Sequence, residues 1–461
     1  MKTESIASMC EAVVDCPHST PVWTDSGYVV LRNQNIKDGR LDLSAPSYTD
    51  EEHFKQRVRR MAPRAGDIVI TREAPMGEVC KIPEGLTCCL GQRQVLLRPK
   101  AGVNPDYLLY ALQSPFVQDQ IRWNEGTGST VSNIRIPVLE KIEIPRLGSS
   151  EEFIAVTLRA FDAKIDVNRR INQTLEAIAQ ATFQSWFVDF DPVKAKVAAT
   201  AEGRDPLRAA MTVISGKPDT ELDNLPSDQF TRLATTAALF PDEMDDSELG
   251  EIPKGWTVQS MGQLTTKIGS GATPRGGKEV YLAEGIALIR SQNVYDSLFV
   301  WEGLARITDE AAAQLKGVAV QENDVLLNIT GASILRTCVV LPDVLPARVN
   351  QHVAIVRAKA GIPSRFLHQS LLLTENKNHL LGLNAGGSRE AVTKAHIESL
   401  AVRVPGAELL AAFDLIVAAM FTQVELCARE ARVLAELRDT LLPKLLSGEL
   451  QVGNTEAEDA A

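Results

Sequence analysis

The 461-residue sequence has no long uninterrupted apolar run, and this excludes proteins that depend on one. No apolar stretch approaches the roughly 18 residues that cross a membrane. The first residues, MKTESIASMCEAVVD, contain no basic segment followed by an apolar core, so we expect no secretion signal. Hydrophobic residues make up 44% and charged residues 23%, which is typical of a soluble globular protein. We therefore expect a cytoplasmic protein with no membrane partner.

Cysteine and histidine are too few and too scattered to build a site. The seven cysteines form no C-x-x-C pair, and an odd number in a chain of this length does not indicate a disulfide framework. A reducing compartment fits this pattern. The six histidines do not cluster with cysteines or carboxylates at the spacing of metal ligands. We expect no bound metal ion.

Catalytic motifs are missing as well. Residues 271–278 (GATPRGGK) resemble a phosphate-binding loop, but the spacing is wrong and Glu279 stands where Ser or Thr is needed. Asp191-Pro192-Val193 matches only part of the motif of amino-methyl transferases. We find no nucleophile elbow either. The sequence predicts a protein that is not an enzyme and has no cofactor of its own.

A strong positive charge is also absent, because the net charge is −11. Residues 201–250 hold 4 basic and 11 acidic residues, and residues 406–461 hold 4 and 10, so most of the negative charge lies there. By contrast, residues 1–150 hold 18 of each kind, and residues 251–405 hold 16 basic and 13 acidic residues. These two large segments permit DNA contact on one face, with a partner supplying much of the phosphate contact.

What the sequence does contain is an internal repeat. Residues 32–36 (RNQNI) match residues 290–294 (RSQNV), and residues 66–71 (GDIVIT) match residues 323–328 (NDVLLN). Gln92 corresponds to Gln351, and each precedes an apolar strand. A Gly/Ser loop and a strand that ends in proline follow in both halves. The order of features predicts a duplicated α/β domain, which could be purely structural or a two-site binder.

Each repeat is followed by a long helical pattern, over residues 149–188 and 406–447. Apolar residues recur every three or four positions, as in a coiled-coil seam. The predicted buried stripe includes Ile171, Leu175 and Ile178 in the first helix and Leu434, Leu437 and Leu441 in the second. Asn168 and Asn172 fall where the first stripe shifts, which indicates either a stutter or a polar layer. Two such helices packed antiparallel would relate the two halves by a pseudo-twofold axis. The alternative is that each helix packs only on its own domain.

Three segments resemble the specificity subunits of type I restriction–modification systems. They are FQSWFVDFDPVKAK (183–196), LFPDEMDDSELGEIPKGW (239–256) and LRDTLLPKLLSGEL (437–450). The resemblance covers essentially the whole chain. The fold it implies is α+β/mixed, with two duplicated α/β target-recognition domains separated by two long antiparallel coiled-coil helices, pseudo-twofold. The first half lacks an IPKGW-like lead-in, so we expect its first strand to be irregular.

The resemblance also divides the chain. Its parts are recognition domain 1 (1–148), spacer helix 1 (149–188), an acidic connector (189–250), recognition domain 2 (251–405), spacer helix 2 (406–447) and a C-terminal tail (448–461). Each recognition domain would read one half of a bipartite target in double-stranded DNA, and the helices would set the spacing. The subunit would dock two modification (methyltransferase) subunits and restriction (helicase-nuclease) subunits. S-adenosylmethionine, ATP and Mg²⁺ would be bound by those partners.

Candidate contact residues follow from chemistry, because arginine suits guanine, glutamine and asparagine suit adenine, and hydroxyls suit phosphates. We expect DNA contact from Arg32, Gln34, Asn35, Arg72, Arg93, Thr127, Ser129 and Thr130, and from Arg275, Arg290, Gln292, Asn293, Arg336, Asn350, Gln351, Ser388 and Arg389. The R-x-Q-N pair occurs in both halves, which could reflect architecture instead of base reading.

We expect partner contact from Phe183, Trp186, Phe187, Leu441 and Leu445, although the aromatic segment could equally be core. A rival function is a coiled-coil protein-interaction scaffold without intrinsic DNA readout. DNA binding measured with and without a methyltransferase partner would separate the two functions.

Overall fold

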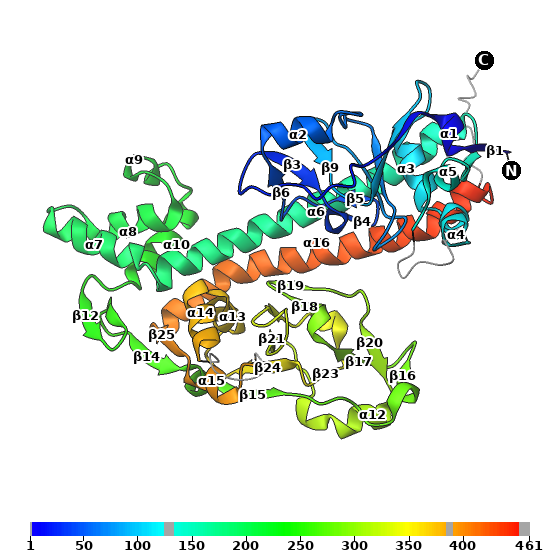
Figure 1. Ribbon diagram of the computed structural model, residues 1–461. Helices are drawn as coiled ribbons and strands as arrows, with labels where there is room; N and C mark the ends of the chain where they lie inside the picture. Colours follow the sequence, from blue (N-terminus) through cyan, green and yellow to red (C-terminus); the bar gives the residue numbers. More distant parts are fainter. Residues whose placement is uncertain (1, 124–132, 384–390, 451–461) are drawn as a thin grey trace, which may run out of the picture. The chain divides into compact units, whose positions relative to one another are not determined.

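The computed structural model describes residues 2–123, 133–383 and 391–450 and falls into two compact units (Figure 1). One unit joins residues 1–169 to residues 428–461, and the other holds residues 170–427. Each unit contains an α/β domain and part of each of two long helices. The fold is therefore mixed, with the duplication that the sequence predicts.

The first domain alternates short strands with short helices. In chain order these are β1 (Lys2–Ser5), α1 (Ile6–Met9), β2 (Cys10–Asp15), β3 (Tyr28–Leu31), η1 (Asn33–Asn35), β4 (Ile36–Lys37), β5 (Arg40–Leu41), β6 (Ser47–Thr49), α2 (Glu51–Arg57), β7 (Ile68–Thr71), β8 (Val79–Lys81), β9 (Cys88–Leu90), β10 (Gln94–Pro99), α3 (Pro105–Gln113), α4 (Pro115–Trp123), α5 (Ile136–Leu139) and β11 (Glu143–Arg146).

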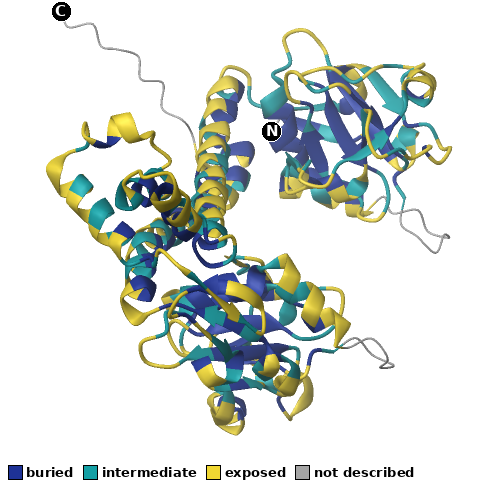
Figure 2. Cartoon of the chain, turned by 90° about the vertical axis from the view of Figure 1, so that its left-hand side faces the viewer, coloured by how far each residue is buried: buried dark blue, intermediate teal, exposed yellow. Residues whose placement is uncertain are grey.

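Its central sheet is antiparallel, with the strand order β2-β10-β7-β8. Alternate residues of a strand point to opposite faces, and both faces of β7 are covered. Ile68 and Ile70 join the cluster that contains α3, whereas Val69 joins the cluster that contains Leu31 of β3. The apolar run of β7 therefore contains no polar alternation, because both of its faces are buried. Every residue of β7 and of β21 is buried, and Figure 2 shows buried strands inside both domains.

The second domain repeats this plan, with β16 added at the edge of one sheet and with extra 3-10 turns. It contains β14 (Thr257–Ser260), α11 (Met261–Leu264), β15 (Thr265–Ser270), η2 (Gly277–Val280), β16 (Tyr281–Leu282), β17 (Ile286–Ile289), η3 (Ser291–Asn293), β18 (Val294–Tyr295), β19 (Leu298–Phe299), β20 (Ala305–Ile307), α12 (Asp309–Gln314), η4 (Lys316–Val318), β21 (Val325–Asn328), β22 (Thr337–Val339), η5 (Pro342–Val344), β23 (Ala347–Val349), β24 (Val353–Ala358), α13 (Ser364–Leu372), α14 (Thr374–Gly382), α15 (Lys394–Ser399) and β25 (Ala401–Val404).

The sheet orders of the two domains match. The order β15-β24-β21-β22 repeats that of the first central sheet, and the parallel pair β17–β23 repeats β3–β9. The terminal pair β14–β25 likewise repeats β1–β11, with antiparallel register in both. Our expectation of an irregular first strand was wrong, because β1 pairs from Lys2 to Ser5 without a register shift.

The long helices are α6 (Ser150–Phe187) and α16 (Ala407–Ser447). In the first unit the early part of α6 lies beside the late part of α16, and the two run antiparallel. Asp162 bonds to Arg438 and Asn168 bonds to Glu430, so the numbering falls along one helix as it rises along the other. Both helices also pack on the first domain through Leu158 and Leu445.

In the second unit the late part of α6 meets the early part of α16. The rings of Phe183 and Phe187 lie 5.8 and 5.0 Å from that of Phe413, measured between centroids. Each unit therefore contains one part of each helix. The alternative in which each helix packs only on its own domain is wrong.

The buried face of α6 differs from the predicted stripe. Asn168 and Asn172 are buried, with exposed fractions of 1% and 9%, whereas Ile178 is exposed and Ala179 is buried in its place. The asparagines thus form a polar layer within the helix face, and the stutter is wrong. In α16, Leu437 is exposed as well.

Among the described helices, α16 alone has the length and apolar composition of a membrane-crossing helix. Its Arg438 is 2.6 Å from Asp162 of α6. Its apolar side chains, among them Phe413 and Leu445, pack in the cores of the two units, so α16 is not evidence of a membrane span.

The segment between α6 and the second domain is folded. It contains α7 (Asp191–Ala201), α8 (Pro206–Ser215), α9 (Asp219–Leu222), α10 (Ser227–Ala238) and the hairpin of β12 (Met244–Ser247) with β13 (Gly250–Pro253). Met211 and Leu222 lie in its own small apolar cluster. Arg208 bonds to Asp219 and Asp223, so part of the acidic charge is neutralised locally.

Candidate nucleic-acid interface

Polar side chains gather at one end of each central sheet, where β7 or β21 ends and β10 or β24 begins. In the first domain this end includes the η1 turn, because Asn33 donates its Nδ2 hydrogen to the carbonyl of Glu73. In the second domain it includes η3, because Asn328 donates to the carbonyl of Ser291. We call these groups the polar edges of the two domains.

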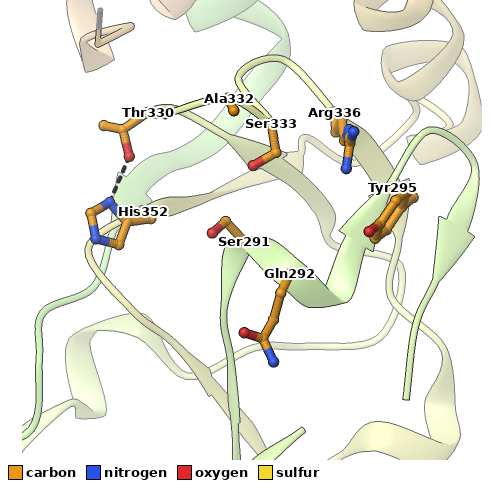
Figure 3. A pocket seen from close by; sticks show the side chains of 9 residues that line it. Ser291, Gln292, Tyr295, Thr330, Ala332, Ser333, Arg336 and His352 are labelled. Carbon is orange, nitrogen blue, oxygen red and sulfur yellow. Dashed lines mark hydrogen bonds between the residues drawn. The ribbon is translucent and has the colours of Figure 1, made fainter. Parts of the chain in front are cut away.

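The second polar edge is hollowed into a pocket of about 400 Å³. Its lining comes from η3, from β18, from the loop after β21 and from the residue before β24 (Figure 3). The lining residues are Ser291, Gln292, Tyr295, Thr330, Gly331, Ala332, Ser333, Arg336 and His352. Hydroxyl, amide, imidazole and guanidinium groups therefore converge there, which suits hydrogen bonding to base edges.

Two contacts order the side chains of this pocket. The guanidinium of Arg336 lies over the ring of Tyr295, 4.3 Å from its centroid, and this cation–π contact restricts a flexible side chain. Thr330 Oγ1 lies 2.5 Å from His352 Nδ1, the contact drawn as a dashed line in Figure 3. The pocket thus presents groups that are already oriented before any ligand arrives.

The first polar edge has different side chains on the same backbone plan. Arg93 is exposed and its Nε lies 3.3 Å from Oε2 of Glu73. The other carboxylate oxygen of Glu73 accepts a hydrogen bond from Asn133 at 2.5 Å. Nearby, the guanidinium of Arg32 lies 5.3 Å from the centroid of the exposed Trp23 ring.

Comparison with known proteins identifies the family. Residues 19–177 match the family described as "Type I restriction modification DNA specificity domain". The chain is 30% identical over 377 residues to the type I restriction enzyme HindI specificity subunit of Haemophilus influenzae, covering 77% of this chain and 80% of that one. The chain belongs to the type I restriction enzyme specificity subunits.

Further relatives agree with this assignment. The MjaIX specificity subunit of Methanocaldococcus jannaschii is 26% identical over 405 residues, covering 87% of this chain and 81% of that one. The crystal structure of a type I restriction–modification S subunit from M. genitalium has the same fold, with a TM-score of 0.53 at 14% identity, covering 96% of this chain and 95% of that one. The role of this specificity subunit is DNA recognition, and the protein-only scaffold is not favoured.

Two predicted contact residues of the specificity subunit have a structural role instead. Asn35 and Asn293 are buried, with exposed fractions of 3% and 0%. Each accepts a hydrogen bond from the backbone N–H of the arginine three residues earlier, and each donates to a carbonyl, of Asp42 or Val300. We correct both expectations, because the shared R-x-Q-N motif closes a turn in each domain.

Arg72 and Asn350 are corrected for the same reason. Arg72 Nη1 lies 2.8 and 2.9 Å from the two carboxylate oxygens of Asp15, and its Nε donates to the carbonyl of Ile134. Asn350 is 8% exposed, and its side-chain oxygen accepts from the N–H of His352. Arg290 is half-buried and donates to the carbonyl of Gly303, so it is only partly available.

Other predicted residues remain accessible on or near the polar edges. Arg32, Gln34, Arg93, Arg275, Gln292 and Gln351 are exposed, and Arg336 is half-buried. Gln351 accepts a hydrogen bond from Thr273, which links the loop that carries Arg275 to the second edge. DNA contact by these residues stays a prediction. Thr127, Ser129, Thr130, Ser388 and Arg389 lie outside the described residues.

Four of the five predicted partner contacts are wrong, and partner contact by Leu441 stays a prediction. Phe183, Trp186 and Phe187 are each 2 or 3% exposed and belong to the largest apolar cluster of the second unit. Leu445 is 6% exposed and packs with the half-buried Leu441 in the core of the first unit. The three aromatic side chains and Leu445 are therefore buried in the cores of the specificity subunit itself.

Five further residues of the polar edges were not predicted from the sequence: Trp23, Glu73, Tyr295, Thr330 and His352. The repeat carried a signal for the last two, because aligning residues 66–71 with 323–328 places Thr330 opposite Glu73. The match of Gln92 with Gln351 likewise places His352 opposite Arg93. The repeat gives no signal for Trp23 or Tyr295, because the role of each depends on the arginine that lies over its ring.

In the described part of the chain, no group of three or more His, Cys, Asp or Glu side chains is arranged to hold a metal ion. All seven cysteines are buried and unbridged. Burial raises the pKa of the Cys10 thiol to about 12, and that of Cys89 to about 11. Thiolate chemistry therefore plays no part at the polar edges.

Proposed function

We propose that this specificity subunit reads a bipartite DNA target, with each α/β domain reading one half-site through its polar edge. The observation that carries the proposal is the shared sheet plan of the two domains, with different side chains at the same end of each central sheet. A duplicated frame with diverged contact groups is what two different half-sites require.

The chain would act without catalysis of its own, in the cytoplasm. Two modification subunits would bind S-adenosylmethionine and methylate adenine, and restriction subunits would use ATP and Mg²⁺ to cleave DNA. The relatives named above are specificity subunits of type I restriction enzymes, which supports a place in such an assembly.

Exchange of one domain tests the division of labour. Residues 251–405 are replaced by those of a relative, and the chimera is expressed with the modification subunit. Adenine methylation is then mapped by long-read sequencing. We expect one half-site to change and the other to persist. A change in both half-sites, or in neither, would contradict the proposal.

Binding measurements test dependence on the partner. Because the chain carries a net charge of −11, we expect the isolated subunit to bind target DNA weakly and with a shallow salt dependence. The complex with the modification subunit should bind tightly, with a steep salt slope from added phosphate contacts. Equal affinity with and without the modification subunit would reject this assignment of phosphate contacts.

A further inference from the structure

The two polar edges share a set of equivalent backbone positions. The N–H of Arg72 bonds to the carbonyl of Arg93, and the N–H of Ile329 bonds to the carbonyl of His352. The carbonyls of Arg72 and Ile329 in turn accept bonds from Ile134 and Val392. The register of β7 with β10 and of β21 with β24 agrees with this match.

It follows that Glu73 and Thr330 occupy equivalent backbone positions in the two domains. Arg93 and His352 likewise stand at one position, opposite the first. In both domains the two side chains contact each other across the edge, through an ion pair at 3.3 Å in one and a hydrogen bond at 2.5 Å in the other. The arrangement is conserved between the domains while its chemistry has changed completely.

The residues that support the two polar edges, by contrast, are the same in both domains. Asn35 and Asn293 close the same turn, and Asp67–Arg98 and Asp324–Arg357 form the same buried ion pair. A pair under purely structural demand would be expected to follow that pattern.

The backbone of Arg93 gives a further indication. Its φ is 66°, in the left-handed region that residues other than glycine rarely adopt. Such strained positions concentrate at sites of function.

We propose that Glu73–Arg93 and Thr330–His352 are the specificity-determining pairs that make the two half-sites different. In this proposal, which rests on the proposed function, Glu73–Arg93 reads a G·C base pair in the major groove. Arginine donates to O6 and N7 of guanine, and a carboxylate accepts from the N4 amino group of cytosine, so one pair can address both bases.

The second pair has neither a carboxylate nor a guanidinium. Thr330 offers a hydroxyl and a methyl group, and the ring of His352 lies 3.0 Å from the amide nitrogen of Gln351 through its Nε2. A threonine methyl group suits the methyl group of thymine, and the amide of Gln351 suits the N6 and N7 groups of adenine. In this proposal the corresponding base pair of the second half-site is not G·C.

Exchange of the pairs tests the proposal. T330E/H352R gives the second domain the pair of the first, and E73T/R93H makes the reverse change. Each variant is expressed with the modification subunit, and methylation is mapped by long-read sequencing. We expect T330E/H352R to change one base pair of the second half-site to G·C and E73T/R93H to remove a G·C preference in the first.

A matched control is Q321E/K359R, which places the same two side chains at the opposite ends of β21 and β24, at exposed positions. It should methylate the wild-type sequence. If either exchange variant also methylates the wild-type sequence unchanged, the pairs do not determine specificity and the proposal is overturned.

Where an exchange variant gives no methylation, the conservative variant E73Q decides. Its complex is tested for binding against a panel of single base-pair changes in the first half-site. Discrimination at one base pair should fall by about tenfold or more, and wild-type discrimination at every position would overturn the proposal. Failure of the proposed function has a different result, because the wild-type complex would then show no bipartite target at all.

Discussion

The carboxylate of Asp67 accepts hydrogen bonds from Nε and Nη2 of Arg98, at 2.9 and 2.8 Å. The second domain repeats this pair with Asp324 and Arg357, at 2.7 Å for both bonds. Both aspartates are buried, with exposed fractions of 1% and 0%. Each aspartate precedes a central strand, and each arginine lies on the neighbouring strand. The pair therefore fixes the register of the central sheet.

Removal of one partner should destabilise its own unit. D67N or D324N leaves an arginine without its counter-charge in a largely buried site, so we expect a loss of roughly 3–5 kcal/mol in the free energy of unfolding of the unit concerned. Denaturant unfolding of each variant measures this loss. E51Q breaks the exposed pair with Lys55 as a control and should cost much less stability than D67N. Equal effects of D67N and E51Q would contradict the structural role.

The aromatic cluster of α6 should govern stability and not partner binding. Phe187 is 2% exposed and lies against Phe366, Phe413 and Trp256. F187A should lower the free energy of unfolding by roughly 3–5 kcal/mol, as measured by denaturant titration. I178A, on the exposed side of the same helix, should have little effect. A folded F187A variant of wild-type stability that no longer binds the modification subunit would restore the partner-contact interpretation.

Stability of the second unit should decline below neutral pH because of His368. Burial lowers the pKa of His368 to about 4, and its Nε2 lies 3.2 Å from the carbonyl oxygen of Thr337. Asp296 raises this pKa, and Lys377 and Arg365 lower it, to smaller extents. The unfolded chain takes up a proton near pH 6.5 while the folded one stays neutral, so acid favours unfolding.

We expect this contribution to be fully present above about pH 6.5 and to be lost as the pH falls toward 4, by at most about 3 kcal/mol. Unfolding of wild type and H368L at several pH values measures the difference. H368L should flatten the profile, whereas H379Q, at an exposed position, should leave it unchanged. If the free energy of unfolding of H368L depended on pH as steeply as that of wild type, His368 would not be the origin of the pH dependence.

Arg336 should contribute to reading of the second half-site. Its stack on Tyr295 holds the planar guanidinium ready for a bidentate contact with guanine, which lysine cannot make. R336K should reduce discrimination at one base pair by about tenfold or more, in competition binding by the complex with the modification subunit. Y295F retains the ring and should behave as wild type, and Y295L should resemble R336K in part. Unchanged discrimination in R336K would remove Arg336 from the contact set.

The helix pair should set the distance between half-sites. Since the buried face of α6 continues through Asn168, a length change has to preserve the heptad. Insertion of seven residues after Asn168 and of seven after Glu430, which bonds to it, adds about 10.5 Å. This length corresponds to about three base pairs.

Methylation mapping should then find both half-sites unchanged and the spacer longer. Insertion of two residues at each point rotates the stripe by about 200° and should abolish activity. An active seven-residue variant that keeps the original spacing would show that the helices do not act as a ruler.

Much of the architecture followed from the sequence alone. The duplication was visible because turn residues, β-branched runs and prolines recur in the same order, and these signals act locally. The long helices were visible because a coiled-coil seam repeats over many turns. Even so, the stripe of α6 was misplaced near Ile178, since burial there depends on which residues of α16 and the second domain lie opposite.

The fate of individual polar and aromatic side chains was decided only by the tertiary structure. Arg72 and Arg93 look alike in the sequence, yet Arg72 is bound by Asp15 and Ile134, which lie 57 and 62 positions away, and Arg93 is exposed. The sequence determined which groups were available to touch DNA. Contacts between distant segments determined which of those groups the fold itself uses, because a side chain that is buried, with its polar atoms bonded inside the protein, is not accessible to a ligand.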